Sequence, residues 1–105
     1  MTDRIAVSGT LERFVEPGGG SSSYYLPISG DPAEALTGLE LARRLETGKR
    51  RGFGALRVTL HLGTHSWQTS AFPLKGEGWF VPVKVAVLRA EGIGEGDAVS
   101  LLIEI

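Results

Sequence analysis

Five side chains in this sequence have the chemistry to hold a ligand: Arg50, Arg51, Trp67, Ser70 and Lys84. The two arginines stand beside a glycine-rich stretch, where guanidinium groups can grip a phosphate or carboxylate through two parallel hydrogen bonds. The indole of Trp67 offers a stacking surface, while Ser70 and Lys84 offer polar anchors for a ligand in a cleft. These five residues form the candidate ligand-binding site.

The same residues also have structural explanations. A basic run such as Lys49-Arg50-Arg51 is typical of a solvated connection between a helix and a strand. Trp67 and Phe72 are an odd number of positions apart, so they cannot share one face of a regular strand. We therefore expect at least one of these two aromatic residues to pack in the core.

Signals for catalysis or for a metal are weak. His61 and His65 flank a tight turn, but no third ligand stands near them, and catalytic zinc ions usually have three protein ligands. Ser70, His65 and Asp97 supply the residue types of a catalytic triad without the Gly-x-Ser-x-Gly motif that exposes a nucleophile. We predict no catalytic residue, no metal site and no cofactor.

Composition narrows the class of protein. The chain has 105 residues, the size of one domain, and its 11 basic and 12 acidic residues give a net charge of -1. A sequence-independent nucleic-acid binder normally has a basic excess. The absence of cysteine excludes disulfides and thiol catalysis. The N-terminus does not resemble a signal peptide, and no apolar run approaches the roughly 20 residues of a membrane span, so we expect a cytoplasmic protein without a membrane partner.

Alternating apolar and polar residues predict most of the secondary structure. Long strands are expected over 4–14, 56–62, 66–72 and 98–105, and shorter ones over 24–28 and 79–81. The glycine- and serine-rich stretch 16–23 predicts a mobile hairpin loop. Together with two helices, these strands predict a mainly β (α+β) fold over residues 1–105, in which the sheet curls into a small barrel that hides its edges.

Two helices are predicted from their end signals. Asp31 is a suitable N-cap, Pro32 fits the first helical position, and Gly48 is a suitable C-terminal stop. Pro82 is expected to open a second helix that continues to about Glu91 and ends before Gly92.

Four blocks of sequence carry a resemblance to a known family. They are, in chain order, Lys49–Val58, Trp67–Pro73, Phe80–Lys84 and Gly92–Val99. Together they are similar to the DUF1905 family of small bacterial and archaeal proteins, and the similarity covers nearly the whole chain. The resemblance implies a double-split β-barrel of about six strands capped by two short helices, and it implies no established activity.

The implied architecture is shared with swapped-hairpin DNA-binding domains of the AbrB, MazE and MraZ type. Val81-Pro82, Gly92-Ile93 and Gly96-Asp97 repeat the turn chemistry of those domains in the same order. The arginine that leads into the strand in those domains is replaced here by Trp79 and Phe80. The resemblance therefore implies the shared fold and argues against nucleic-acid binding.

We predict a non-enzymatic binding or interaction module that takes a small anionic ligand or a peptide. The alternative is an AbrB-like nucleic-acid-binding or regulatory protein, and an enzyme comes third because no nucleophile is accompanied by its base. A barrel completed within one chain needs no partner, which favours a monomer, although an exposed strand edge would also allow a dimer.

Overall fold

The structure is a computed structural model that describes residues 3–15, 17–19, 22–48, 54–76 and 78–105. In this part of the chain it contains seven strands and two helices. In order these are β1 (Arg4–Thr10), β2 (Glu12–Val15), β3 (Ser22–Ile28), α1 (Gly30–Thr47), β4 (Leu56–Leu62), β5 (His65–Pro73), β6 (Trp79–Val83), α2 (Val85–Glu91) and β7 (Ala98–Glu104). The mainly β prediction is confirmed.

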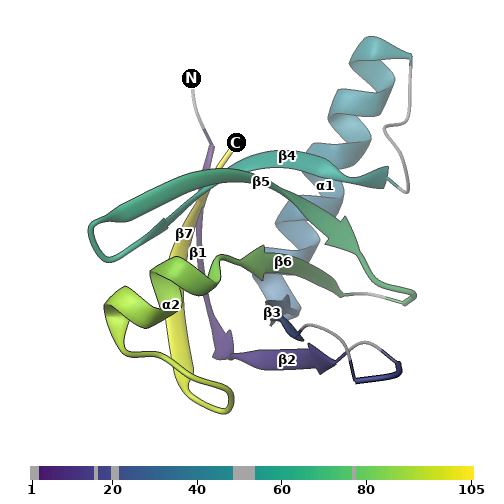
Figure 1. The fold of residues 1–105 in the computed structure, drawn as a ribbon. Helices are drawn as coiled ribbons and strands as arrows, with labels where there is room; N and C mark the ends of the chain where they lie inside the picture. The colour runs from purple at the N-terminus through teal and green to yellow at the C-terminus, as the bar shows by residue number, and fades with distance from the viewer. Residues whose placement is uncertain (1–2, 16, 20–21, 49–53, 77) are drawn as a thin grey trace.

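The strands form one antiparallel sheet in the order β1-β7-β4-β5-β6-β3-β2. Its two end strands, β1 and β2, follow each other in the chain with only Leu11 between them. Opposite ends of the sheet must therefore meet at Leu11, and the sheet curls into a half-barrel (Figure 1). The backbone of Leu11 is held there by hydrogen bonds to the carbonyl of Asp97 and from the amide of Gly96, both 2.9 Å long.

The break at Leu11 corrects one boundary. The sequence predicted a single strand over 4–14, whereas the structure divides it into β1 and β2, which raises the strand count to seven. Gly9 explains how β1 crosses close to β3 just before the break. A Cβ atom at Gly9 would lie 3.2 Å from both the Leu26 side chain and the Pro27 carbonyl oxygen, which is closer than side chains normally approach.

The core is mostly aliphatic, with Trp67 and Trp79 as its two aromatic members, and lies on the concave face of the sheet. Alternate residues of β4 point into it, as their periodicity predicted, and β3, β6 and β7 contribute in the same way. The largest fully buried side chains are Leu11, Leu26, Leu36, Leu56, Leu60, Val81, Val99 and Ile103. No described polar or charged residue is buried.

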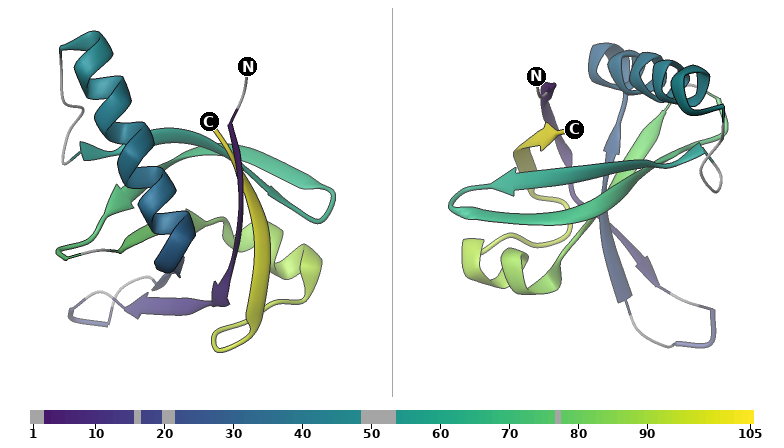
Figure 2. Two further views of the ribbon diagram at one scale, coloured as in Figure 1. Left: turned by 180° about the vertical axis from the view of Figure 1, so that it is seen from behind. Right: turned by 90° about the horizontal axis from the view of Figure 1, so that it is seen from above.

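Helix α1 packs by its N-terminal half and projects past the sheet with its C-terminal half (Figure 2). Ala33 and Leu36 are buried, whereas Leu45 in the last turn is 75% exposed. The indole N–H of Trp79 in β6 donates to the Thr37 hydroxyl over 3.0 Å and ties the packed half to the sheet. No described helix is long and apolar enough to cross a membrane.

The ends of α1 agree in part with the prediction. Gly48 is the C-cap, with a φ of 72° that suits glycine, as expected. The predicted N-cap Asp31 is wrong, because the helix begins at Gly30 and Ser29 is the N-cap. Ser29 makes no side-chain capping hydrogen bond, so this helix start depends on packing.

Helix α2 covers one end of the half-barrel through Val87 and Leu88 (Figure 1). The prediction that Pro82 opens this helix is wrong, because Pro82 lies in β6 opposite Tyr25 of β3, and α2 starts only at Val85. The ladder between β5 and β6 consists of two pairs, Phe72 with Phe80 and Pro73 with Trp79. Pro82 stands beyond that ladder, where its missing N–H interrupts no pairing with β5.

Candidate functional site

The structure does not bring the five sequence-predicted residues into one cleft. Arg50 and Arg51 lie outside the described residues. Trp67 is 9% exposed and belongs to the core, whereas Ser70 lies an odd number of positions away on the outer face of β5. Lys84 is exposed immediately before α2. Trp67 therefore cannot act as a stacking surface beside Ser70.

The aromatic residue that does face outward is Phe72, and its strand partner Phe80 faces outward with it. The expectation that at least one of Trp67 and Phe72 packs in the core is confirmed, because Trp67 is buried. On the outer face of β3 and β6, aromatic rings alternate with proline rings. Tyr25 lies opposite Pro82, and Pro27 lies opposite Phe80.

Phe80 is the centre of this ring surface. Its ring stacks on Phe72 with centroids 5.3 Å apart and planes inclined by 26°. It also receives Tyr25 edge-on, with centroids 5.7 Å apart and planes inclined by 72°. Aromatic pairs of this kind contribute about 0.5–1.5 kcal/mol beyond burial alone, so they fix the orientation of these half-buried rings.

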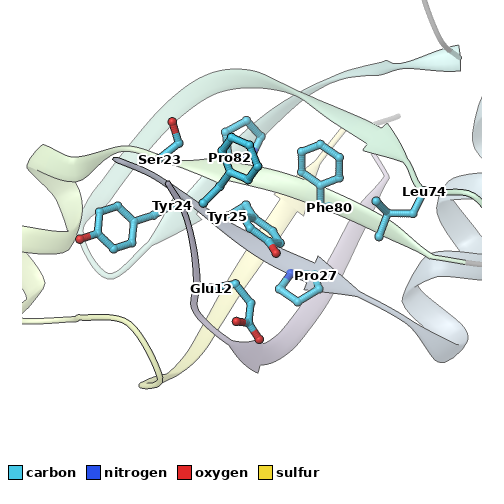
Figure 3. Close-up of a pocket in the computed structure, with 9 residues that line it drawn as sticks. Glu12, Ser23, Tyr24, Tyr25, Pro27, Leu74, Phe80 and Pro82 are labelled. Atoms are coloured by element: carbon cyan, nitrogen blue, oxygen red, sulfur yellow. The ribbon is translucent and has the colours of Figure 1, made fainter. Parts of the chain in front are cut away.

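The rings of Tyr25, Pro27, Phe80 and Pro82 form the floor of an open groove on the outer face of β2, β3 and β6, with a volume of about 600 Å³ (Figure 3). We call it the aromatic groove. Phe14 and Leu74 add large apolar side chains that are 54% and 43% exposed. Among the described residues, the lining consists of Glu12, Phe14, Ser23, Tyr24, Tyr25, Pro27, Leu74, Phe80 and Pro82.

Residues 4–103 match the family model described as Domain of unknown function (DUF1905). The chain belongs to this family. No curated protein matches the chain. All nine lining residues of the aromatic groove fall inside the matched part of this DUF1905 domain. The family description assigns no activity, so it is the residues of the aromatic groove that indicate what the domain could bind.

The electrostatic character of the groove comes from one side chain. Among the described lining residues, Glu12 is the only carboxylate, and there is no lysine or arginine. Glu12 is exposed and makes no ion pair within the part of the chain that the structure describes. Its neighbour Arg13 points to the other face of β2 and pairs with Glu95 over 3.4 Å. An occupant of the groove therefore meets apolar rings and an unpaired negative charge.

The two histidines of the DUF1905 domain have separate partners. His61 Nε2 lies 2.7 Å from Glu104 on β7, and His65 Nε2 lies 3.4 Å from Glu91 on α2. They do not form a shared site, and the described residues contain no group of three His, Cys, Asp or Glu placed to hold a metal ion. Both pairs instead connect neighbouring elements of the fold.

Sequence reasoning missed the aromatic groove because its residues come from strands that are distant in the chain. The usable signal was local: Tyr25 and Pro27 alternate in one segment, and Phe80 and Pro82 alternate in another. Proline is uncommon inside strands, so two strands that each combine a ring and a proline on one face are a distinctive pattern. Because Pro82 was interpreted as the start of a helix, this pattern of rings and prolines was not recognised.

Proposed function

We propose that this DUF1905 domain is a non-enzymatic interaction module that binds a peptide segment in the aromatic groove. The observation that carries this proposal is the contiguous set of outward-facing rings centred on Phe80, with exposed Phe14 and Leu74 at its margins. Soluble proteins seldom expose large contiguous apolar patches unless the patch has a partner.

A peptide suits this groove better than a small anion does. Small-molecule sites bury most of the ligand surface, whereas this groove is open along the outer face of the sheet (Figure 3). Its lining also offers Glu12 and no described lysine or arginine, a charge that repels anions. An extended segment can cover several rings at once and remain exposed on its other side.

Selection from a random peptide library displayed on phage tests the proposal. We expect the wild-type domain to enrich related peptides, and we expect Phe80→Ala to lose them because it removes the ring that contacts both Tyr25 and Phe72. The control is Thr59→Ala on β4, outside the groove lining. Leu74→Ser provides a second groove variant that leaves the ring contacts intact.

Two results would contradict the proposal. One is the absence of any enriched peptide, and the other is enrichment of the same peptides by wild type, Phe80→Ala and Leu74→Ser. The AbrB-like alternative is tested by titrating a DNA duplex at low salt, where electrostatic binding is strongest. Saturable duplex binding that survives Phe80→Ala would replace the peptide proposal.

A further inference from the structure

We infer that the segment recognised by the aromatic groove is a proline-containing peptide in the polyproline II conformation, with a basic side chain placed against Glu12. This inference rests on the proposed function and adds the chemical class of the partner. Three properties of the groove lead to it: the rigidity of its floor, the absence of free backbone donors on that floor, and its charge.

The floor of the groove is a set of rigid rings. Pro27 and Pro82 have ring-closed side chains, and the aromatic rings of Tyr25 and Phe80 hold each other in an edge-to-face arrangement with centroids 5.7 Å apart. The register places Tyr25 opposite Pro82 and Pro27 opposite Phe80, so these rings lie on one face of the two strands, and Figure 3 shows them gathered at the groove. Aromatic-lined grooves bind polyproline II segments because proline rings pack against the flat rings and the segment is already extended before binding.

The main chain of β3 and β6 offers few hydrogen bonds to a peptide that lies on the groove floor. β3 and β6 are paired with each other from Tyr24 opposite Val83 to Ile28 opposite Trp79, so the main-chain groups along this shared edge are used within the sheet, and they lie in its plane instead of facing the groove. Pro27 and Pro82 have no N–H at all. A peptide on this floor must therefore bind through side chains, and a polyproline II segment, whose backbone stays solvated, meets that condition.

The negative charge of Glu12 favours a basic residue in the bound peptide. Glu12 lies directly opposite Tyr25 in the ladder between β2 and β3. A lysine or arginine of the peptide can pair with the carboxylate of Glu12 while lying near the face of the Tyr25 ring. Both interactions are modest at an exposed site, and together they correspond to about a 10-fold gain in affinity.

The main rival is a β-strand added to the outer edge of β2. β2 is an end strand of the sheet, and all four of its residues are exposed. A strand added there would bind through backbone hydrogen bonds, and consecutive prolines would prevent it because they remove N–H groups from both edges of the added strand. Proline content therefore distinguishes the two modes of binding.

Fluorescence anisotropy with four labelled synthetic peptides tests the inference. The first peptide has pairs of consecutive prolines separated by leucines and carries one arginine at its N-terminus; the second replaces the arginine by glutamate. The third replaces the prolines by alanine, and the fourth is an arginine-bearing repeat of valine and threonine. We expect the wild-type domain to bind the first peptide about 10-fold more tightly than the second, and more tightly than the third and fourth.

Charge reversal at Glu12 supplies the matched protein variant. Glu12→Arg should invert the preference between the arginine and glutamate peptides, whereas Glu46→Arg, an equal change of net charge on exposed α1, should leave it unchanged. Equal binding of the four peptides, tighter binding of the valine–threonine peptide, or an unchanged preference in Glu12→Arg would overturn the inference.

Failure of the inference is distinguishable from failure of the proposed function. If the library yields peptides that need Phe80 and Leu74 but lack proline and basic residues, the interaction module stands and its partner class is wrong. If no peptide depends on these groove residues, both are wrong.

Discussion

The outer surface of the sheet has two halves that differ in chemistry although the same strand alternation builds both. Over β1, β7 and β4 the outward side chains are mostly polar, with Ala6, Ala98 and Leu102 among them: Ser8 bonds Ser100 at 3.0 Å, and Glu104 lies 2.7 Å from His61 and 3.9 Å from Arg4. Over β2, β3 and β6 the outward side chains are those of the aromatic groove.

The polar half shows what this fold requires of an outward residue, which is only compatibility with water. Strands β4 and β7 contribute fully buried Leu60 and Ile103 to the core while their outer faces are mostly polar and carry no aromatic ring except the imidazole of His61. Barrel formation therefore does not explain the rings of Tyr25 and Phe80. A second surface that covers those rings does explain them, and this contrast is the basis of the proposed function.

The largest effect on stability is expected on the inner face of the groove strands. Leu26 is fully buried between Tyr25 and Pro27, and Leu26→Ala should lower the free energy of unfolding by about 2–5 kcal/mol because it leaves a cavity in the core. Urea denaturation measures this change. A loss below about 1 kcal/mol would mean that the two faces of β3 do not differ as described.

The next largest effect is expected at the centre of the outer rings. Phe80→Ala removes contacts with Phe72 and Tyr25, so it should cost about 1–3 kcal/mol in unfolding free energy. Peptide affinity should fall at least about 10-fold, as expected for an aromatic anchor at the centre of an interface. Isothermal titration with a library-selected peptide, at a temperature where both proteins are folded, checks the affinity. Full retention of affinity would remove the functional contrast between the two halves.

A smaller effect is expected where β6 contacts α1. Trp79 is next to Phe80 but faces inward, and Thr37→Val would leave its buried indole N–H without the 3.0 Å hydrogen bond. We expect a loss of about 1 kcal/mol in thermal or urea unfolding and unchanged peptide affinity. Impaired binding in Thr37→Val would show that the groove depends on the helix, contrary to the division between inner and outer faces.

The smallest effect is expected on the polar half. Glu104→Gln weakens exposed interactions with His61 and Arg4, which should change the unfolding free energy by at most about 1 kcal/mol, less at high salt. Peptide affinity should not change. A loss of binding in this variant would place the functional surface on the polar half instead of the aromatic groove.

Periodicity and end signals predicted much of the fold. The alternation over 56–62 and 98–105 identified β4 and β7, and Gly48 and Gly92 marked the ends of both helices. The break at Leu11 could not be predicted because this residue continues the inward alternation of Val7. Periodicity records which face a residue occupies and not which strand lies beside it.

The site was less predictable for the same reason. Separation along β5 was enough to predict that Trp67 and Phe72 face opposite ways, and the structure confirms it. The pairing of Tyr25 with Pro82 is set by long-range register between β3 and β6, which no local signal contains. The local sequence around Pro82 is compatible with the first turn of a helix and with an edge position in a strand. Only the pairing of the surrounding strands determines which of the two structures forms.

The most direct test of the central claim is nuclear magnetic resonance mapping of the isotope-labelled domain titrated with a library-selected peptide. We expect chemical-shift changes at Glu12, Tyr25 and Phe80 and none at His61 or Ser100. Changes concentrated on the polar half, or none at the groove with saturating peptide, would contradict the claim that the aromatic groove is the binding surface.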